Sequence, residues 1–317
     1  MNALNIQSKF KAVLLGTFAG DAFGLPFEFS GRTDGDIVIQ RASEKGYWGY
    51  SDDTEMMIGI SEALIKNRDF DPELTLNILA ENYEPARGYG KSIKLVFRHM
   101  KQGGKWEDAA YTAWEDGSEG NGAASRIAPV ACIYHSDNEN LEIKLKLSAR
   151  ITHAHANGIT GAFIQGLAIA YLIQLPGADF FEEYEFLSYL LNHPSVEHTV
   201  FAEKLDYIEK AVRNSCPDEE AISFLGNGVL AKDSVPAGLY FFLKNCRNFE
   251  KAICNAACNG GDTDTICAMV GALSGALNGM EAIPESWLFN LEKGGKGIAY
   301  VSQLSDNLFN IWHNNKK

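Results

Sequence analysis

Positive charge is scarce in this 317-residue sequence, in which 28 lysines and arginines face 41 aspartates and glutamates for a formal net charge of −13. An acidic surface of this kind repels nucleic acid and anionic membranes. The sequence also lacks any run of about 18 consecutive apolar residues, the length that a membrane-spanning helix needs. We therefore expect neither nucleic acid nor a membrane among the partners of this protein.

Cysteine pairs of the Cys-x-x-Cys type are absent, and the six cysteines are scattered over the sequence. We interpret them as reduced residues of the protein core. The apolar run 12–20, preceded by Lys9 and Lys11, superficially resembles a signal peptide. It ends at Asp21, and cleavage nearby would remove residues to which we assign chemistry below. We therefore interpret the run as a core helix and expect a cytoplasmic protein.

Strand-like alternation of polar and apolar residues is also hard to find, whereas apolar residues recur at helical spacing. Ile266, Met269, Val270 and Leu273 are one example of this 3.6-residue period. No repeat, low-complexity linker or change of composition marks a domain boundary. The sequence therefore predicts an all-α protein with a single compact multi-helix domain over residues 1–317. The candidate helices are 9–23, 53–66, 73–83, 91–102, 107–115, 123–134, 142–155, 157–174, 180–191, 198–213, 236–245, 249–258, 264–278 and 297–313.

Two acidic clusters stand at predicted helix starts, Ser51-Asp52-Asp53 and Asp262-Thr263-Asp264-Thr265. Each cluster alone is typical of helix N-capping, because Asp, Ser and Thr accept backbone hydrogen bonds there and the helix dipole favours their charge. Capping uses only one such residue, so several oxygen ligands remain. If the fold brings the clusters together, four carboxylates repel one another unless a cation lies between them.

The ligands that these clusters offer are all oxygen atoms, without cysteine or paired histidine. Such a set favours a hard cation, Mg²⁺ or Mn²⁺ and less strongly Ca²⁺, and it disfavours zinc. Two ions that share a bridging aspartate would accommodate this many carboxylates. The residues thus indicate a metal site, while capping remains the alternative for each cluster alone.

Glu28 follows an apolar helix and a proline turn, and it has apolar residues on both sides. Burial there would raise its pKa into the range that a general acid or base needs near neutral pH. A surface glutamate without a catalytic role is the alternative. Asp21, which lies deeper in the apolar run, is expected to make a structural hydrogen bond.

Glycine-rich loops precede three predicted helices, at 86–90, 117–122 and 259–261. A loop of this kind offers unpaired backbone N–H groups to an anion such as a phosphate, with a plain connection between helices as the alternative. The segment 121–126 adds a hydroxyl and a guanidinium at a helix start. That combination suits phosphate or ribose, and it suits a structural role equally well.

His153 and His155 lie two residues apart, a spacing that keeps them off a common helix face. The spacing argues against a dinuclear site built from histidines. One of the two is expected to line a ligand pocket, and the other to have a structural role.

Taken together and in order, these segments resemble the ADP-ribosylglycohydrolase family, which includes the dinitrogenase-reductase-activating glycohydrolase and the animal ADP-ribosylhydrolases. The similarity covers most of the chain, and the ordered set of motifs is highly specific although each motif alone is weak. The matching segments are Gly20-Asp21-Ala22 through Glu28, Ser51-Asp52-Asp53-Thr54, Arg87-Gly88-Tyr89-Gly90, Gly120-Asn121-Gly122-Ala123-Ala124-Ser125-Arg126, Thr152-His153 and Gly260-Gly261-Asp262-Thr263-Asp264-Thr265.

The resemblance implies an all-α fold with a dinuclear site, in which two Mg²⁺ or Mn²⁺ ions bind the ribose next to the scissile bond. It also implies that Glu28 is the flexible catalytic glutamate of the family. We expect Glu28, or a water oriented by Asp53, to transfer the proton. The metal ligands carried over from the family are Ser51, Asp52, Asp53, Asp262, Asp264 and Thr265. The substrate-binding residues carried over are Gly88, Tyr89, Gly90, Asn121, Gly122, Ala123, Ser125, Arg126 and His153.

The expected function is that of an enzyme, a metal-dependent hydrolase that releases ADP-ribose from a modified protein side chain. Ser51 stands where the family usually has threonine, and it keeps the hydroxyl that a metal needs. Arginine-specific members carry a Ser-Gly-Tyr segment where this sequence reads Ser234-Val235-Pro236-Ala237-Gly238-Leu239-Tyr240. The Arg-Gly-Tyr-Gly loop is more similar to the branch that cleaves serine-linked or other O-linked ADP-ribose. We therefore expect serine or O-linked substrates over arginine.

Two alternatives to this function stay open. One is a non-catalytic ADP-ribose-binding member of the same fold, and the other is a metal-dependent nucleotide phosphohydrolase. The expected partner is ADP-ribose or an ADP-ribosylated protein, and we favour a monomer.

Overall fold

Helices build this protein throughout residues 3–315, the part of the chain that the computed structural model describes. Within that part, extended backbone segments pair only at two isolated bridges, Trp48 with Leu291 and Gly120 with Leu230. The expected all-α fold is therefore confirmed. The helices, with four short 3₁₀ turns (η) among them, are in chain order α1 (Ala3–Gly24), η1 (Leu25–Phe27), α2 (Gly35–Ser43), α3 (Asp52–Asn67), α4 (Pro72–Asn82), η2 (Pro85–Arg87), α5 (Lys91–Lys101), α6 (Trp106–Ala109), α7 (Gly122–Ser125), α8 (Ala128–Tyr134), α9 (Leu141–Arg150), α10 (Ala156–Gln174), η3 (Ala178–Phe180), α11 (Glu183–Leu191), α12 (Val200–Arg213), α13 (Asp218–Leu225), α14 (Ala231–Lys244), α15 (Phe249–Cys258), α16 (Thr263–Asn278), η4 (Met280–Ala282), α17 (Glu285–Asn290) and α18 (Ile298–Asn315).

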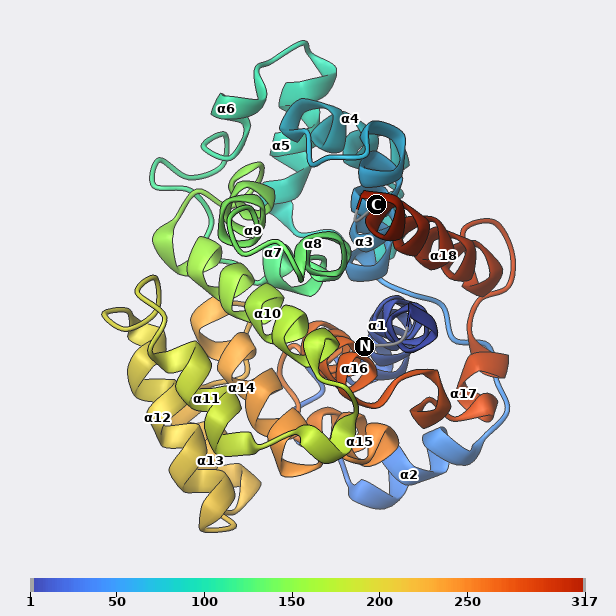
Figure 1. Cartoon of the computed structure of the whole chain (residues 1–317), viewed down its shortest axis with the longest axis vertical. Coiled ribbons are helices and arrows are strands. Elements are labelled where there is room, and N and C mark those ends of the chain that lie inside the picture. Colours follow the sequence, from blue (N-terminus) through green and yellow to red (C-terminus); the bar gives the residue numbers. More distant parts are fainter. Residues whose placement is uncertain (1–2, 316–317) are drawn as a thin grey trace.

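The centre of the fold is an antiparallel pair of helices, α1 and α16 (Figure 1). The two backbones approach so closely that a Cβ added at Gly20 would lie 2.0 Å from the carbonyl oxygen of Cys267. Gly16 and Gly271 meet in the same way about one turn further along. Because the helices run in opposite directions, the start of α16 lies beside the end of α1. The acidic cluster that opens α16 is thereby placed next to residues 21–28.

Further helices cover this central pair. α18 packs on α1 and α3, whereas α14 and α15 pack on α16. α10 contacts α16 and also covers α8, α9 and α14. The buried apolar side chains form one continuous cluster from Ile6 to Trp312, so a single hydrophobic core supports the whole array.

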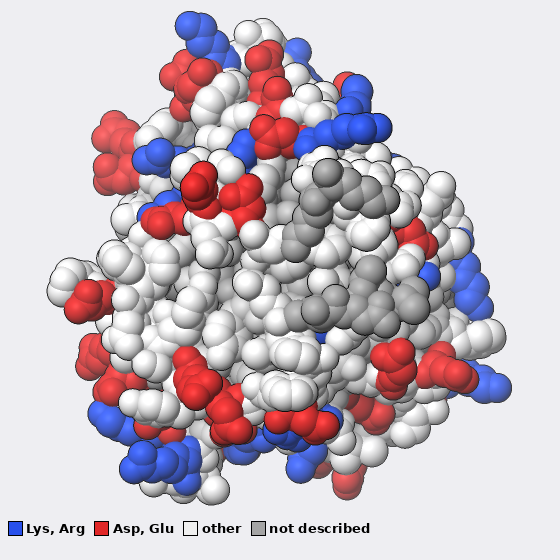
Figure 2. Space-filling view, viewed as in Figure 1, with Lys and Arg blue, Asp and Glu red and all other residues white. Residues whose placement is uncertain are grey.

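α10 is long and apolar enough by composition to span a membrane, with a mean hydropathy of 1.4, although polar residues such as Asn157 and Gln165 interrupt its apolar run. In the structure, however, 72% of this apolar segment is buried inside the protein. Its small residues allow close packing, since a Cβ at Gly166 would lie 2.3 Å from Leu145. Burial among neighbouring helices accounts for the apolar composition of α10. Figure 2 shows the molecule in the view of Figure 1, with many charged side chains toward the upper and lower ends and a largely uncharged area left of the centre.

Residues 110–121 form an irregular loop where the sequence predicts a helix over 107–115. Only α6 is helical in that range, so most of this prediction is wrong. Within this loop Gly117 has a left-handed backbone conformation, with φ +79°, which residues other than glycine rarely adopt and which is incompatible with an α-helix. The loop is important because it forms one wall of the cavity described below.

The predicted helix over 123–134 is divided into α7 and α8. Pro129 stands in the first turn of α8, where its missing N–H costs little, whereas one continuous helix would need that donor. The helix predicted over 236–245 begins earlier in the structure, because α14 starts at Ala231. Pro236, the predicted helix start, lies inside α14.

Three helices are missing from the sequence-based prediction: α2, α13 and α17. α2 spans 9 residues and exposes Ile37 and Ile39, so its apolar residues do not share one face. α13 and α17 span 8 and 6 residues, which is too short to show a clear helical period.

Candidate active site

A cavity of about 730 Å³ opens at the end of the central helix pair, where α3 and α16 both begin. The acidic side chains that the sequence singled out line it: Glu28 after η1, Asp52 and Asp53 on α3, and Asp262 and Asp264 at the start of α16. Three further carboxylates, of Glu115, Asp116 and Glu119, line it from the loop before α7. The two acidic clusters, which are far apart in the sequence, therefore meet in one pocket.

Hydrogen bonds join these two clusters directly. The hydroxyl of Thr265 donates to Asp53 Oδ2 at 2.9 Å. Asp53 also accepts a hydrogen bond from the hydroxyl of Ser125, and Asp262 accepts one from the side-chain amide of Asn121. These contacts hold both carboxylates in a fixed orientation at the cavity.

Ser51 caps α3 at the edge of the site. Its Oγ accepts a hydrogen bond from the backbone N–H of Asp53 at 3.2 Å, and the residue is buried. The capping role that the sequence left open is therefore present in the structure, where Ser51 lies just behind the residues that line the cavity. Its role as a metal ligand stays a prediction.

Asp21 supports the start of α3 from the protein core. Its carboxylate accepts hydrogen bonds of 3.1 Å from the backbone N–H groups of Ser51 and Thr54, and a further one from the Thr54 hydroxyl. Burial raises the pKa of Asp21 to about 6, against the opposing effect of these hydrogen bonds. The structural hydrogen bond expected for Asp21 is confirmed.

The cavity carboxylates are crowded and poorly solvated, and their pKa values rise for that reason. Burial, followed by the charge of Asp21, raises the pKa of Asp52 to about 7. Burial also raises the pKa values of Asp53 and Asp264, with neighbouring carboxylates adding to the effect. Burial raises the pKa of Asp262 as well. Each of these groups is thus costly to ionise unless a positive charge is nearby.

A divalent cation would supply that charge. One carboxylate oxygen each from Glu28, Asp262 and Asp264 lies within 4.8 Å of the others, close enough to share an ion. Among the described residues no lysine or arginine forms an ion pair with the cavity carboxylates, and Arg87 on the cavity wall pairs with Glu292 instead. The donor set consists of oxygen atoms, which fits Mg²⁺ or Mn²⁺.

Glu28 ends the η1 turn and is half-buried at the cavity. Burial raises its pKa, and the charges of Asp262 and Asp21 raise it further. A glutamate in this environment keeps its proton closer to neutral pH than a surface glutamate does. The following residue, Phe29, donates its backbone N–H to the carbonyl of Gly261 at 2.8 Å, which ties the segment after Glu28 to the start of α16.

Arg87 anchors the glycine loop that forms another wall of the cavity. Its guanidinium donates two hydrogen bonds of 2.9 Å to the carboxylate of Glu292 and one of 2.9 Å to the carbonyl of Tyr50. It also lies 3.6 Å from the centre of the Tyr50 ring. The neighbouring Gly88 and Gly90 line the cavity.

The expected substrate-binding residues divide into two groups in the structure. Those that line the cavity are Gly88, Gly90, Asn121, Gly122 and His153. Those that lie behind its wall are Tyr89, Ala123, Ser125 and Arg126.

The residues behind the wall support the site without facing the cavity. The Tyr89 hydroxyl donates to Glu55 at 2.6 Å in the interior. Arg126 is fully buried, with its guanidinium directed at Thr152 and the carbonyl of Ser148. This placement differs from the direct ligand contact that the sequence suggested, because α7 turns the residues after Gly122 toward the core.

Both histidines of the 153–155 segment line the cavity. α9 ends at Arg150 rather than at the predicted residue 155, so His153 lies outside the helix. His155 also caps α10, since its Nδ1 accepts the backbone N–H of Asn157 at 3.1 Å. Both histidines thus have a pocket position, and His155 also has the structural role that was expected of one of them.

The loop of residues 114–120 forms another wall. Its second half belongs to the glycine-rich loop 117–122 that the sequence analysis singled out, whereas residues 114 and 115 were predicted to be helical. It is attached to the segment before α14 by backbone hydrogen bonds from Asn121 to Val229, at 3.1 Å, and from Ala231 to Glu119, at 2.9 Å. The glycines at 117 and 120 were the sequence signal for this loop, and both line the cavity.

The mouth of the cavity is aromatic. Trp114 and Phe29 both line it and have exposed fractions of 60% and 63%. Neither residue stood out in the sequence, where an isolated aromatic residue beside a polar one indicates nothing specific. Exposed aromatic rings at the rim of a pocket are suited to flat or apolar parts of a ligand.

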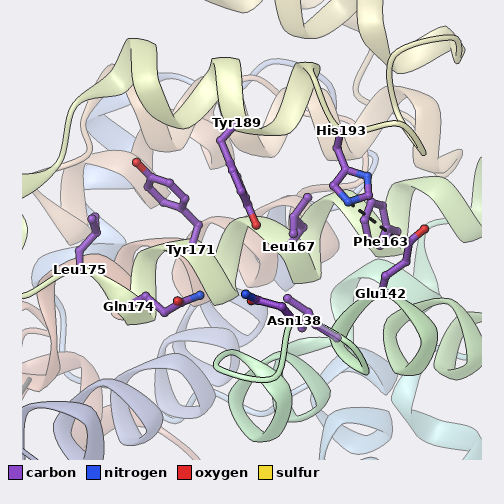
Figure 3. A pocket seen from close by; sticks show the side chains of 10 residues that line it. Asn138, Glu142, Phe163, Leu167, Tyr171, Gln174, Leu175, Tyr189 and His193 are labelled. Atoms are coloured by element: carbon purple, nitrogen blue, oxygen red, sulfur yellow. Dashed lines mark ion pairs between the residues drawn. The ribbon is translucent and has the colours of Figure 1, made fainter.

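A second cavity, of about 490 Å³, lies between α10, α11 and the start of α9 (Figure 3). Its lining includes the aromatic side chains of Tyr171 and Tyr189. Its single carboxylate among the described residues, Glu142, already pairs with Lys146 at 2.5 Å and lies 3.8 Å from His193. Because no cluster of carboxylates faces this cavity, the first cavity is the candidate active site.

Comparison with known proteins shows the family to which the chain is related. A family model described as ADP-ribosylglycohydrolase matches residues 2–317. ADP-ribosylhydrolase ARH3 of Bos taurus is 31% identical, over 88% of this chain and 87% of the relative. ADP-ribosyl-[dinitrogen reductase] glycohydrolase of Rhodospirillum rubrum is 25% identical, over 92% and 93% of the two chains. A solved structure titled "ADP-ribosylglycohydrolase-related protein complex" has the same fold, with a TM-score of 0.70 and 22% identity over 97% of this chain and 99% of that one.

Proposed function

Because the chain belongs to the ADP-ribosylglycohydrolase family and is thereby a glycosidic-bond hydrolase, we propose that it releases ADP-ribose from a modified protein side chain. The observation that carries this proposal is the convergence of Glu28 and the two acidic clusters of α3 and α16 in one cavity. The cavity volume of about 730 Å³ suits a ligand of nucleotide size. The relatives named above are called an ADP-ribosylhydrolase and an ADP-ribosyl glycohydrolase, which supports the same reaction.

The cofactor in this proposal is a pair of Mg²⁺ or Mn²⁺ ions. Raised pKa values support a cation at these carboxylates, and so does the lack of a pairing lysine or arginine within residues 3–315. When bound, the ions would fix the ribose hydroxyls and offset the negative charge of the site. The residues that would hold them are Ser51, Asp52, Asp53, Asp262, Asp264 and Thr265.

Glu28 is the residue placed to move a proton. Hydrolysis adds water to C1″ of the ribose and breaks the bond from C1″ to the acceptor side chain, which leaves with a proton. A carboxyl with a raised pKa can donate that proton from Oε and can accept one from the attacking water. Asp53, whose two oxygens are held by Ser125 and Thr265, is oriented to position the water.

The glycine loops of the cavity suit the diphosphate of the ligand. Gly88 and Gly90 on one wall, and Gly120 and Gly122 on another, line the cavity without side chains. Their backbones can therefore approach a phosphate closely, which a Cβ would prevent. The exposed ring of Trp114 stands at the mouth beside the second of these walls.

We further propose that serine-linked or other O-linked ADP-ribose is the preferred substrate. Ser234 and Tyr240, in the segment that differs from arginine-specific members, are fully buried in α14. The hydroxyl of Tyr240 donates to Asp218, away from the cavity. The wall nearest to this segment is formed by the apolar side chains of Val229 and Leu230.

A panel of ADP-ribosylated peptides tests the proposal. Each peptide carries ADP-ribose on serine, arginine or another side chain, and mass spectrometry identifies the products after incubation with Mg²⁺. Release of intact ADP-ribose, fastest from serine, is the expected result. Tight binding of ADP-ribose without turnover of any linkage would point to a non-catalytic binder, and release of phosphate would point to a phosphohydrolase.

A further inference from the structure

A short chain of hydrogen bonds leads from the protein core to the cavity through Arg126, Thr152 and His153. Arg126 Nη2 donates to Thr152 Oγ1 at 2.6 Å, and the same Oγ1 lies 2.6 Å from His153 Nδ1. The exposed fractions of the three residues are 0%, 3% and 8%. Only the last of them, His153, lines the cavity.

The chemistry of the donors fixes the direction of each bond. A guanidinium has donors and no acceptor, so Thr152 must accept the hydrogen bond from Arg126. The threonine hydroxyl retains one proton, and its other hydrogen-bond partner among the described residues is Nδ1 of His153. Thr152 therefore donates to Nδ1, which must carry a lone pair. In a neutral imidazole the ring proton then resides on Nε2.

The surroundings of His153 keep the imidazole neutral. Burial, and in addition the positive charge of Arg126, lowers the pKa of His153 to about 3. The ring thus holds one proton throughout the neutral pH range, and it is a poor carrier of a second one.

The protonated nitrogen is directed at the glycines of the cavity wall. A Cβ added at Gly120 would lie 3.3 Å from Nε2 of His153, and a Cβ at Gly122 would lie 3.9 Å from it. No residue in the described part of the chain accepts a hydrogen bond from Nε2. Glycine at both positions leaves this N–H accessible from the cavity.

We propose that Thr152 and Arg126 are positioning residues, which hold His153 as its Nε2–H tautomer so that this N–H donates to an oxygen of the bound ADP-ribosyl group. The identity of the ligand rests on the proposed function, whereas the tautomer does not. Phosphate and ribose oxygens offer the same acceptor chemistry. His153 acts as a fixed donor in this arrangement, and Glu28 is left as the group that transfers protons.

NMR of the full-length protein labelled with ¹⁵N-histidine reads the tautomer directly, because protonated and unprotonated ring nitrogens differ widely in chemical shift. His153→Gln identifies the relevant signals by their loss. The wild type is expected to show a protonated Nε2 and a bare Nδ1. Thr152→Ser keeps the hydroxyl and should preserve this pattern, whereas Thr152→Val keeps the shape and should abolish the preference. A protonated Nδ1 in the wild type, or an unchanged tautomer in Thr152→Val, would overturn the proposal.

Titration with free ADP-ribose and Mg²⁺ tests the contact itself. The Nε2–H signal should move on binding in the wild type and in Thr152→Ser. In Thr152→Val the Michaelis constant for an ADP-ribosylated peptide should rise about 10-fold with little change in kcat, as expected for one lost hydrogen bond to the ligand. Binding that leaves the Nε2–H signal unmoved would overturn the contact. An Nε2–H that responds to ADP-ribose in a protein without turnover would support this proposal and contradict the proposed hydrolase function.

Discussion

Thr265 and Asp53 share a hydrogen bond of 2.9 Å although 212 residues separate them in the chain. The contact exists because α16 runs antiparallel to α1, so that its first turn meets the first turn of α3. Two acidic clusters, each of which resembles an ordinary helix cap, become one cavity in this way. The function proposed for this protein depends on their convergence.

Asp264→Ala should remove the stabilisation of the protein by Mg²⁺ or Mn²⁺, because this carboxylate is central to the acidic cluster. Thermal unfolding with and without metal should show a rise in Tm for the wild type and none for the variant. Asp206→Asn is a matched control, since Asp206 is exposed on α12 and paired with Lys210. A full metal-induced shift in Asp264→Ala would contradict the metal assignment.

The stabilisation by metal should grow as the pH rises from about 6 to about 8. The pKa of Asp52 is raised to about 7 in the folded protein. A raised value means that metal-free folded protein gains stability at low pH, and loses it as the pH rises through about 7. Metal competes with the same protons, so its effect has the opposite trend. Tm measured across this range with Mg²⁺ and with a chelator checks both signs, and a metal shift independent of pH would argue against these carboxylates as ligands.

Gly20→Ala should destabilise the fold by about 3 kcal/mol, because the added Cβ would lie 2.0 Å from the carbonyl oxygen of Cys267 in the central helix pair. Urea unfolding measures the change. Gly35→Ala is the control, since nothing lies within 4 Å of a Cβ added there, and it should change stability by about 0.5 kcal/mol or less. Equal stabilities of the two variants would show that α1 and α16 do not pack as described.

Glu292→Gln should weaken substrate binding more than it slows the chemical step. The bidentate pair with Arg87 holds the loop that carries Gly88 and Gly90. Loss of one charge should raise KM about 5-fold to 10-fold, the range for a weakened charge-assisted hydrogen bond. Steady-state kinetics on an ADP-ribosylated peptide separates KM from kcat. Glu285→Gln, at an exposed position on α17, should leave both constants unchanged.

Much of the site could be predicted from sequence, because its chemistry is concentrated in short segments. Asp52, Asp53, Asp262 and Asp264 stand at helix starts with more acceptors than capping requires. Glu28 was recognisable as an acid in apolar surroundings, and burial does raise its pKa. The meeting of the two clusters could not be derived from spacing alone, since it depends on the antiparallel packing of α1 and α16.

The remaining parts of the site depend on tertiary structure. The direction of Arg126 follows from the rotation of α7, which turns its guanidinium toward Thr152 and the core. The helix predicted over 107–115 extended too far, so residues 114–116 of the cavity loop were missed, whereas the glycine-rich part from residue 117 was recognised. Short helices such as α17 bury one or two side chains and leave little signal in the sequence.

The most direct test of the central claim is the release of ADP-ribose from a peptide modified on serine, followed by mass spectrometry. Wild-type protein with Mg²⁺ should produce free ADP-ribose and unmodified peptide, and a chelator should stop the reaction. Glu28→Gln should slow it by about 100-fold or more, the usual contribution of a general acid–base residue. An intact substrate after prolonged incubation with wild-type protein and Mg²⁺, or undiminished turnover in Glu28→Gln, would contradict the function proposed for this cavity.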